Sequence, residues 1–284
     1  MIENLETLIA LSKQGTMMEA STALKISQSA VSKRIANLER FYNRDLIERH
    51  GRRVVLTPHG IRLVEKVTPL LSELRSVFLE DQAERKGKII LGVSEAILAS
   101  WGPRLFGQVR QNLPGVEFEF HAQRSPVVLD RLRSGEYMVG LCTGTSDADT
   151  DLVSEVIRDE PMVIIPSGLN DFDYEIGEPL NVITIESRSG AWASIEEDMA
   201  RLRISRAVSL ESFFSVAQMA LAGFGHGLVP AGVAKTLGVA NADVVGLETA
   251  GLTRPVRFVA RKSMFAQELV KSFYNEVCGL INGV

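Results

Sequence analysis

Residues 27–42, SQSAVSKRIANLERFY, constrain the fold more than any other stretch because they predict a helix with two dissimilar faces. One face is apolar at helical spacing, which predicts a buried stripe of Val31, Ile35, Leu38 and Tyr42. The opposite face is small, hydroxylated and basic, without a carboxylate: Ser29, Ser32, Lys33 and Ala36. Such a face suits the major groove of DNA, where small side chains allow close approach. Taken alone, the stretch favours the alternative of an ordinary solvated face.

The residues before this helix change that balance. Apolar residues from Leu5 onward predict a first helix that Gly15 ends in a left-handed cap. Thr16 and Glu19 form a T-x-x-E capping box at the start of a short second helix, 17–24. Ser27 then caps the third helix. Two short helices joined by a three-residue turn predict a helix-turn-helix.

A basic hairpin follows the third helix. We expect a strand near 47–49, a turn at 51–53 and a return strand at 54–56, which together make a wing. Arginines at a hairpin tip suit the minor groove or the flanking phosphates. Residues 1–60 carry nine Lys and Arg against six Asp and Glu, a local charge of +3 in a chain of net charge −4. The predicted DNA-binding residues are Ser27, Gln28, Ser29, Ser32, Lys33, Arg34, Arg49, Arg52 and Arg53.

At this point the sequence resembles the LysR-type transcriptional regulators. Their pattern, A-A-x-x-L-x-x-S-Q-x-A-V-S-x-x-I-x-x-L-E, then G-x-x-L-F-x-R and L-T-x-x-G, is matched by Ala20, Leu24, Ser27-Gln28, Ala30-Val31-Ser32, Ile35, Leu38-Glu39, Leu46, Arg49, Leu56-Thr57 and Gly60. The departures are Ser21, Ser29, Asn43 and Ile47. The resemblance implies a regulator, not an enzyme, that binds double-stranded promoter DNA and a small-molecule effector, needs no cofactor, and forms a homodimer or homotetramer.

Residues 58–86 predict a long connecting helix that begins at Pro58. Its apolar stripe has the spacing of a coiled-coil seam: Ile61, Val64, Val67, Leu71, Leu74 and Phe78. Pairing with the same helix of a second subunit is favoured, as in the family's dimerising linker helix. Packing on the chain's own next domain is the alternative. Pro69 lies inside the run and predicts a kink.

From residue 87 onward, short apolar strands alternate with helices, which predicts an α/β domain with a mainly parallel sheet. Two similar lobes in succession suggest a cleft between them. This half resembles, more loosely, the LysR effector domain with its periplasmic-binding-protein-like fold, on the segments 135–141 and 222–230. The fold class is therefore α+β overall. The expected domains are 1–57 (winged helix-turn-helix), 58–86 (linker helix) and 87–284 (effector domain, with lobe one 88–160 and 262–284, and lobe two 161–261).

Ligands in open α/β lobes bind beyond the carboxyl ends of strands and near helix amino termini. Three segments with hydroxyl groups fit that position: Ser94 to Ala96, Thr143 to Thr145, and Ser187 to Gly190. Arg188, flanked by hydroxyls, suits a small carboxylate or another anion, although a solvated loop with an ordinary cap fits equally well. The predicted effector-binding residues are Ser94, Glu95, Arg124, Thr143, Thr145, Ser187, Arg188 and Ser189.

Other motifs are weaker. Gly92 to Ala96 imitates the nucleophile turn of a hydrolase, so the runner-up function is an esterase or binding protein fused to a helix-turn-helix, but only His121 and His226 could serve it. The glycine-rich segment 223–227 follows a helix, the wrong order for a dinucleotide loop. Cys142 and Cys278 could be redox-active, and no metal-ligand spacing is present.

Two distant cysteines predict no disulfide framework, and the acidic start MIENLET does not resemble a signal peptide. The longest uncharged run, 212–234, contains Pro230 and several glycines and makes a poor membrane span. We therefore expect a cytoplasmic protein without a membrane partner.

Overall fold

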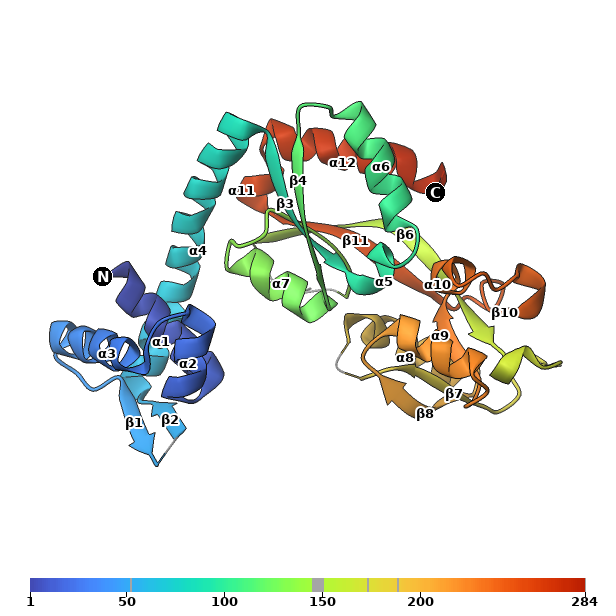
Figure 1. Cartoon of the computed structure of the whole chain (residues 1–284), viewed down its shortest axis with the longest axis horizontal. Helices are drawn as coiled ribbons and strands as arrows, with labels where there is room; N and C mark the ends of the chain where they lie inside the picture. Colours follow the sequence, from blue (N-terminus) through green and yellow to red (C-terminus); the bar gives the residue numbers. More distant parts are fainter. Residues whose placement is uncertain (52, 145–150, 173, 188, 284) are drawn as a thin grey trace. The chain divides into compact units, whose positions relative to one another are not determined.

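The computed structural model describes residues 1–51, 53–144, 151–172, 174–187 and 189–283, and leaves undescribed the side chains of residues 76 and 78–86. These residues form two compact units, Met1–Val77 and Phe78–Val284. Each unit has its own hydrophobic core, and Figure 1 labels most of the elements of both.

The amino-terminal unit is a winged helix-turn-helix whose helix ends follow the sequence signals. Its elements are α1 (Ile2–Gln14), α2 (Met17–Leu24), α3 (Gln28–Tyr42), β1 (Ile47–His50), β2 (Arg53–Leu56) and the first part of α4 (Pro58–Lys86). Gly15 ends α1 with φ 77°. Thr16 Oγ1 accepts a hydrogen bond from the Glu19 backbone N–H at 3.1 Å, and Ser27 Oγ accepts one from the Ala30 N–H at 3.1 Å. The predicted helix-turn-helix and wing are confirmed.

The core of this unit lies between α1, α2 and α3. Val31, Ile35 and Leu38 are buried, as the apolar stripe predicts, against Leu8, Leu11, Met17, Ala20 and Leu46. Tyr42 is 45% exposed, so its predicted burial is wrong. The stripe direction is right, but α3 ends at Tyr42, with Asn43 in the left-handed conformation, and this last turn lies outside the core.

Helix α4 begins at Pro58 and continues through Pro69. The predicted seam along it needs correction. Val64 packs against the core of the amino-terminal unit and Leu71 is buried, so both are used within the chain. Apart from the exposed Ile61, the accessible apolar side chains follow a neighbouring stripe with heptad spacing: half-buried Val67 and the exposed Leu70, Leu74 and Val77. Phe78, the last residue of the predicted seam, has no described side chain. The sequence alone could not separate the two stripes, because both have helical periodicity.

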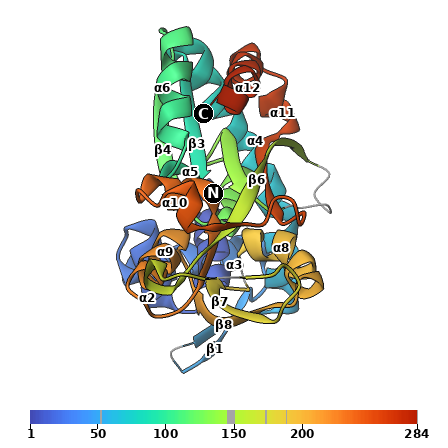
Figure 2. The ribbon, with the colours of Figure 1, turned by 90° about the vertical axis from the view of Figure 1, so that its right-hand side faces the viewer.

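The carboxy-terminal unit has two lobes. The elements of lobe one are β3 (Lys88–Ser94), α5 (Glu95–Leu98), α6 (Gly102–Asn112), β4 (Glu117–Gln123), α7 (Ser125–Arg133), β5 (Val139–Thr143), α11 (Lys262–Phe265), α12 (Glu268–Leu280) and η3 (Ile281–Gly283). Those of lobe two are η1 (Ser167–Leu169), β7 (Leu180–Ile185), α8 (Gly190–Arg201), β8 (Ile204–Leu210), α9 (Phe213–Leu221), β9 (Gly227–Pro230), α10 (Ala231–Thr236), η2 (Asn241–Asp243) and β10 (Val245–Gly246). Figure 2 shows both lobes with α6 and α12 side by side on lobe one.

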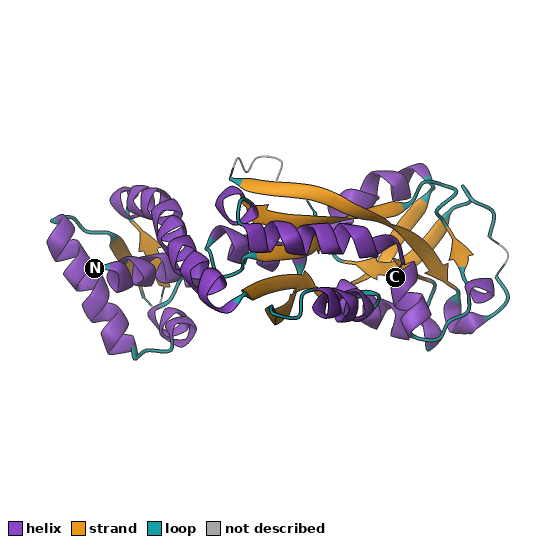
Figure 3. Ribbon diagram, turned by 90° about the horizontal axis from the view of Figure 1, so that it is seen from above, coloured by secondary structure: helices purple, strands orange, loops and turns teal. Residues whose placement is uncertain are grey.

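Two long strands join the lobes: β6 (Leu152–Ile165), the longest orange arrow in Figure 3, and β11 (Thr253–Arg261). They pair antiparallel, from Leu152 with Arg261 to Pro161 with Thr253. The described strands of the carboxy-terminal unit form one sheet in the order β4-β3-β5-β11-β6-β9-β7-β8, with β10 on β6. Pairs within a lobe such as β3–β4 and β7–β8 are parallel, while β6 and β11 pair antiparallel with their neighbours, so the sheet is mixed.

The sequence did not predict β6. Its segment carries four charged side chains and a proline, an unusual composition for a central strand: Glu155, Arg158, Asp159, Glu160 and Pro161. The predicted boundary of lobe two at residue 261 also needs correction. Val256 to Ala260 of β11 pair with β5 and belong to the sheet of lobe one. The predicted helix near 98–112 is also divided, into α5 and α6.

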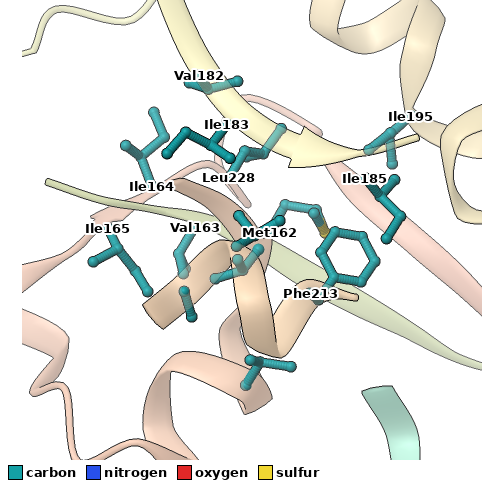
Figure 4. Close-up of a cluster of buried hydrophobic side chains, with 14 of the residues drawn as sticks. Met162, Val163, Ile164, Ile165, Val182, Ile183, Ile185, Ile195, Phe213 and Leu228 are labelled. Carbon is teal, nitrogen blue, oxygen red and sulfur yellow. The ribbon is translucent and has the colours of Figure 1, made fainter. Parts of the chain in front are cut away.

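Each lobe has a separate apolar core. In lobe one, the strand residues Ile89, Leu91 and Val93 pack against α6 and α12. In lobe two, β6, β7 and β9 contribute a near-continuous run of buried aliphatic side chains, as strands covered on both faces require. Figure 4 shows this cluster around Met162, Ile183, Leu228 and Phe213. Phe213 begins α9, so this core fixes the helix end that faces lobe one.

No helix among the described residues combines the length and the apolar character that crossing a membrane requires.

Candidate functional site

The outward face of α3 is the first candidate surface. Gln28, Ser29, Lys33 and Ala36 are exposed and Ser32 is half-buried, so the side chains opposite the buried stripe are accessible. Ser27 is exposed too, but its hydroxyl already caps α3 and lies 2.9 Å from the Ser29 hydroxyl. The face offers hydroxyl, amide and ammonium groups on a helix with small side chains, which is what contact with base edges requires.

Arg34, predicted as a DNA-binding residue, has a partner within the unit. Its guanidinium forms an ion pair with Glu3 of α1, and its side chain is 25% exposed. This pair ties α1 to α3, so Arg34 is a weaker candidate for DNA contact than Lys33. A single helix could not reveal this, because the carboxylate comes from an element 31 positions earlier in the sequence.

The wing is attached to the helical core by side chains of the family pattern. Glu39 Oε1 accepts hydrogen bonds from the backbone N–H groups of Leu46 at 2.9 Å and Ile47 at 3.3 Å. The Val54 N–H donates to the Gly15 carbonyl at 2.8 Å. The start of β1 is therefore held to α3 and the start of β2 to the end of α1. These bonds fix the position of the wing relative to α3.

The junction between wing and α4 is equally close. Thr57 Oγ1 donates to the Asp45 carbonyl at 2.7 Å and accepts from the Gly60 N–H at 3.1 Å. A Cβ on Gly60 would lie 2.1 Å from the Leu46 carbonyl oxygen, so only glycine fits there. Leu56-Thr57 and Gly60, read from the sequence as a family signature, thus have a structural explanation. At the wing itself, Arg49 and Arg53 are exposed on β1 and β2, while Arg52 lies outside the described residues.

The second candidate site is a cavity between the lobes of the carboxy-terminal unit, with about 370 Å³ of empty space when the solvent at its open mouth is counted. It forms where strands of lobe one end and helices of lobe two begin. Its lining residues are Ser94, Glu95, Ala96, Gln123, Arg124, Ser125, Thr143, Ile185, Ser189, Ala191, Glu211, Ser212, Phe213 and Arg254. Of the predicted effector-binding residues, five line it: Ser94, Glu95, Arg124, Thr143 and Ser189. Ser187 is exposed and does not line it, whereas Thr145 and Arg188 lie outside the described residues.

The wall of the cavity in lobe one carries buried hydroxyl groups. Ser125 Oγ accepts a hydrogen bond from the Thr143 N–H at 3.2 Å and lies 3.2 Å from Thr143 Oγ1. Ser94 is 8% exposed, immediately precedes α5 without capping it through its side chain, and has no side-chain hydrogen bond to any described residue. Helices α7, α8 and α9 begin at Ser125, Gly190 and Phe213, beside the cavity. Their amino termini add partial positive charge.

A buried ion pair lies behind the cavity. Arg254 Nε and Nη2 donate to Glu160 Oε2 at 2.8 and 2.5 Å, and the two side chains are 1% and 2% exposed. The Trp101 indole N–H donates to Glu160 Oε1 at 3.0 Å, and the Arg254 guanidinium lies 5.1 Å from the Phe213 ring. Trp101 belongs to lobe one and Phe213 to lobe two, so the pair connects the lobes. Sequence reasoning missed it because both charged residues lie on the long joining strands.

The rim of the cavity is bridged by polar contacts. Arg124 of lobe one forms an ion pair with Glu186 of lobe two, and its Nη1 lies 3.5 Å from Glu211 Oε2. The Ser212 hydroxyl, at the start of α9, donates to Glu95 Oε1 at 3.0 Å. These contacts are ones that a bound ligand could reinforce or replace.

A glycine pair allows the lobes to approach each other beside the cavity. Gly144 has φ 103°, and a Cβ on Gly190 would lie 2.3 Å from the Thr143 carbonyl oxygen. The end of β5 and the start of α8 thus meet backbone to backbone. Larger residues at either position would separate the lobes here.

The alternative chemistries find little support in the described residues. Neither His121 nor His226 lines the cavity that Ser94 lines. His121 contacts Glu119, while His226 Nδ1 accepts the Ser167 N–H at 3.3 Å in lobe two. Cys142 is fully buried, and burial raises the pKa of its thiol to about 12, which keeps it protonated and unreactive. No three His, Cys, Asp or Glu side chains gather into a metal site in the described part of the chain.

Comparison with known proteins agrees with this architecture. Residues 2–61 match "Bacterial regulatory helix-turn-helix protein, lysR family", and residues 82–278 match "LysR substrate binding domain". An uncharacterized HTH-type transcriptional regulator of Vibrio cholerae serotype O1 is 30% identical over 275 residues, which cover 96% of this chain and 93% of that protein. CbnR, a LysR family transcriptional regulator, has a similar structure, with a TM-score of 0.62 at 17% identity over 98% of both chains. Full-length CbnR complexed with its target DNA has a TM-score of 0.53, again at 17% identity and 98% coverage of each chain.

Fold and site together define a winged helix-turn-helix DNA-binding protein with a two-lobed ligand-binding domain. The chain belongs to the LysR family of transcriptional regulators. Members of this family are DNA-binding regulators rather than enzymes. They bind small-molecule effectors in the two-lobed domain and form oligomers.

Proposed function

We propose that this regulator reads promoter DNA with the outward face of α3 and steadies the complex with the wing. The observation that carries the proposal is the exposure of Gln28, Ser29 and Lys33 opposite the buried stripe of the same helix. Ser32, at the centre of that face, would lie closest to base edges, and Arg49 and Arg53 would meet phosphates or the minor groove. Arg52 remains a predicted contact. A regulator that acts on DNA works where the DNA is, and we propose a cytoplasmic location.

The DNA site is tested by affinity at two salt concentrations, with fragments that the protein selects from a random DNA pool. Gln28→Ala and Ser32→Ala should weaken specific binding by about 1–3 kcal/mol. Arg53→Ala should weaken binding to every fragment and lower the salt slope by about 1. Ser12→Ala on α1 and Arg40→Ala near the end of α3 are matched controls. Affinities that stay unchanged in all three test variants would exclude this face and wing.

The effector site is, in our proposal, the cavity between the lobes, and the effector carries an anionic group. Its support is the convergence of the Ser94, Ser125 and Thr143 hydroxyls with the amino termini of α7, α8 and α9. Arg254 lines the same cavity and uses Nε and Nη2 for Glu160, which leaves Nη1 for a ligand. Arg188, next to Ser189, remains a candidate.

Calorimetry with a panel of small carboxylates tests this site. Ser94→Ala should weaken binding of any carboxylate that binds the wild type, because it removes a hydroxyl donor that is open to the cavity and bonds to no described side chain or backbone group. Ser194→Ala, on α8 outside the cavity lining, is the control. Equal affinities for wild type and Ser94→Ala would show that the carboxylate binds outside this cavity. An effector that binds both lobes changes DNA binding only through contacts that differ between the open and closed arrangements.

We also propose that α4 carries the contact between subunits. Val67, Leu70, Leu74 and Val77 form an apolar stripe at heptad spacing, and the last three are exposed in the single chain. The same helix of a second copy offers the matching stripe and would bury it.

A further inference from the structure

The rim of the effector cavity carries more carboxylates than cations among the described residues. Glu95, Glu186 and Glu211 surround it, against the single arginine Arg124, which already pairs with Glu186 and lies near Glu211. The Arg254–Glu160 pair behind the cavity is neutral as a unit. Glu95 and Glu211 line the cavity and are exposed to solvent. These carboxylates would therefore repel a purely anionic ligand as it entered the cavity.

The inner wall has the opposite character. Ser94, with an exposed fraction of 8%, lines the cavity and has no side-chain hydrogen bond to any described residue. Its hydroxyl is open to the cavity and keeps its donor and acceptor capacity, so a ligand atom in the cavity can bond to it in place of water. Ser125 and Thr143 bond mainly to each other, and one of their two hydroxyl hydrogens remains for a ligand.

The cavity thus has a donor-rich inner wall and an acidic rim. We propose that the effector carries an ammonium group as well as its anionic group, as a free amino acid does. The anionic group contacts Ser94, Ser125 and Arg254, and the ammonium contacts Glu95 and Glu211. This inference rests on the proposed effector site and specifies the ligand class for it.

The two carboxylates belong to different lobes, which connects the ligand class to regulation. Glu95 begins α5 of lobe one, and Glu211 precedes α9 of lobe two. An ammonium between them offsets their mutual repulsion and favours the arrangement in which the lobes are close. A dicarboxylate of the same size would place a second negative charge against both glutamates and oppose closure.

Calorimetric titration of the full chain tests the inference with matched probes. The probes are the common free amino acids, their N-acetyl derivatives, which lack the positive charge, and their carboxamides, which lack the negative charge. We expect at least one free amino acid to bind, and both of its derivatives to bind at least about tenfold more weakly.

Variants at the rim sharpen the test. Glu95→Gln and Glu211→Gln should each weaken the amino acid by about tenfold and leave the N-acetyl derivative unchanged or slightly tighter. Glu197→Gln, on α8 away from the cavity lining, is the matched control and should bind like the wild type. Unchanged thermal unfolding of the three variants shows that the folded state is retained.

The possible failures are distinguishable. If carboxylates without an amine bind as tightly as amino acids and lose affinity on Ser94→Ala, while both glutamine variants bind normally, the ammonium site is refuted and the effector cleft stands. If amino acids bind with the same affinity to wild type, Ser94→Ala and both glutamine variants, the cavity is not their site, and both proposals fail. If no probe of any charge type binds, both proposals fail as well.

Discussion

The buried Glu160–Arg254 pair should make the carboxy-terminal unit sensitive to removal of one partner and tolerant of removal of both. Glu160→Leu leaves the Arg254 guanidinium, 1% exposed, without its carboxylate, and also removes the acceptor of the Trp101 N–H. An unpaired charge at such a position destabilises a fold by about 3–5 kcal/mol. At roughly 2–4 °C per kcal/mol for a unit of this size, the midpoint of thermal unfolding should fall by about 6–20 °C.

Tryptophan fluorescence is the suitable measurement, because the chain has two tryptophans and both, Trp101 and Trp192, lie in the carboxy-terminal unit. The signal therefore follows that unit even if the winged helix unfolds separately. The double variant Glu160→Leu, Arg254→Met removes both charges and should recover most of the loss. A midpoint within about 2 °C of wild type for Glu160→Leu, or a double variant no more stable than the single one, would show that the charge of Arg254 does not depend on Glu160.

Three further predictions follow from other parts of the chain. Gly60→Ala should destabilise the amino-terminal unit by about 1–3 kcal/mol, because the added Cβ overlaps the Leu46 carbonyl. Urea unfolding followed by circular dichroism measures the loss, and Gly107→Ala, where a Cβ meets no neighbouring atom, is the control. Leu70→Asp or Leu74→Asp should dissociate the oligomer in sedimentation, whereas Leu169→Asp in lobe two should not. A monomeric wild type would contradict the proposed subunit contact along α4. Native Cys142 should react with iodoacetamide far more slowly than Cys278 in peptide mass mapping, since burial raises the pKa of its thiol to about 12; equal labelling would contradict its burial.

Local signals in the sequence predicted the amino-terminal unit well. A capping threonine, a left-handed glycine and a 3.6-residue stripe act over a few positions, and α2 begins and ends at the predicted residues. What failed depended on distant partners. Tyr42 has stripe spacing but no covering element, and the choice between the two stripes of α4 depends on which one faces the core around Leu38.

The effector cavity was half predictable for the same reason. The rule that ligands lie beyond strand ends identified Ser94, Thr143 and Ser189, since the first two end recognisable strands and Ser189 follows one. Arg254 and Glu211 were missed, because the long strand that carries Arg254 was expected to belong to lobe two and Glu211 is a single acidic residue before a helix. The prediction of an anionic effector was based on Arg188 alone. The carboxylates at the rim could not be predicted, because they meet only when the two lobes come together.

The path of the chain through the two lobes has a consequence for biosynthesis. Lobe two lies within lobe one in sequence, because β3, β4 and β5 come before it and β11 and α12 after it. Val256, Phe258 and Phe273 are buried in the core of lobe one. During synthesis from the amino terminus, these residues are added only after all the central strands of lobe two have been made. Lobe one therefore exposes apolar strand surface until translation is nearly finished, and this nascent state is where chaperones have the most to bind. A frameshift after residue 250 would leave lobe two largely intact and remove the strand next to β5.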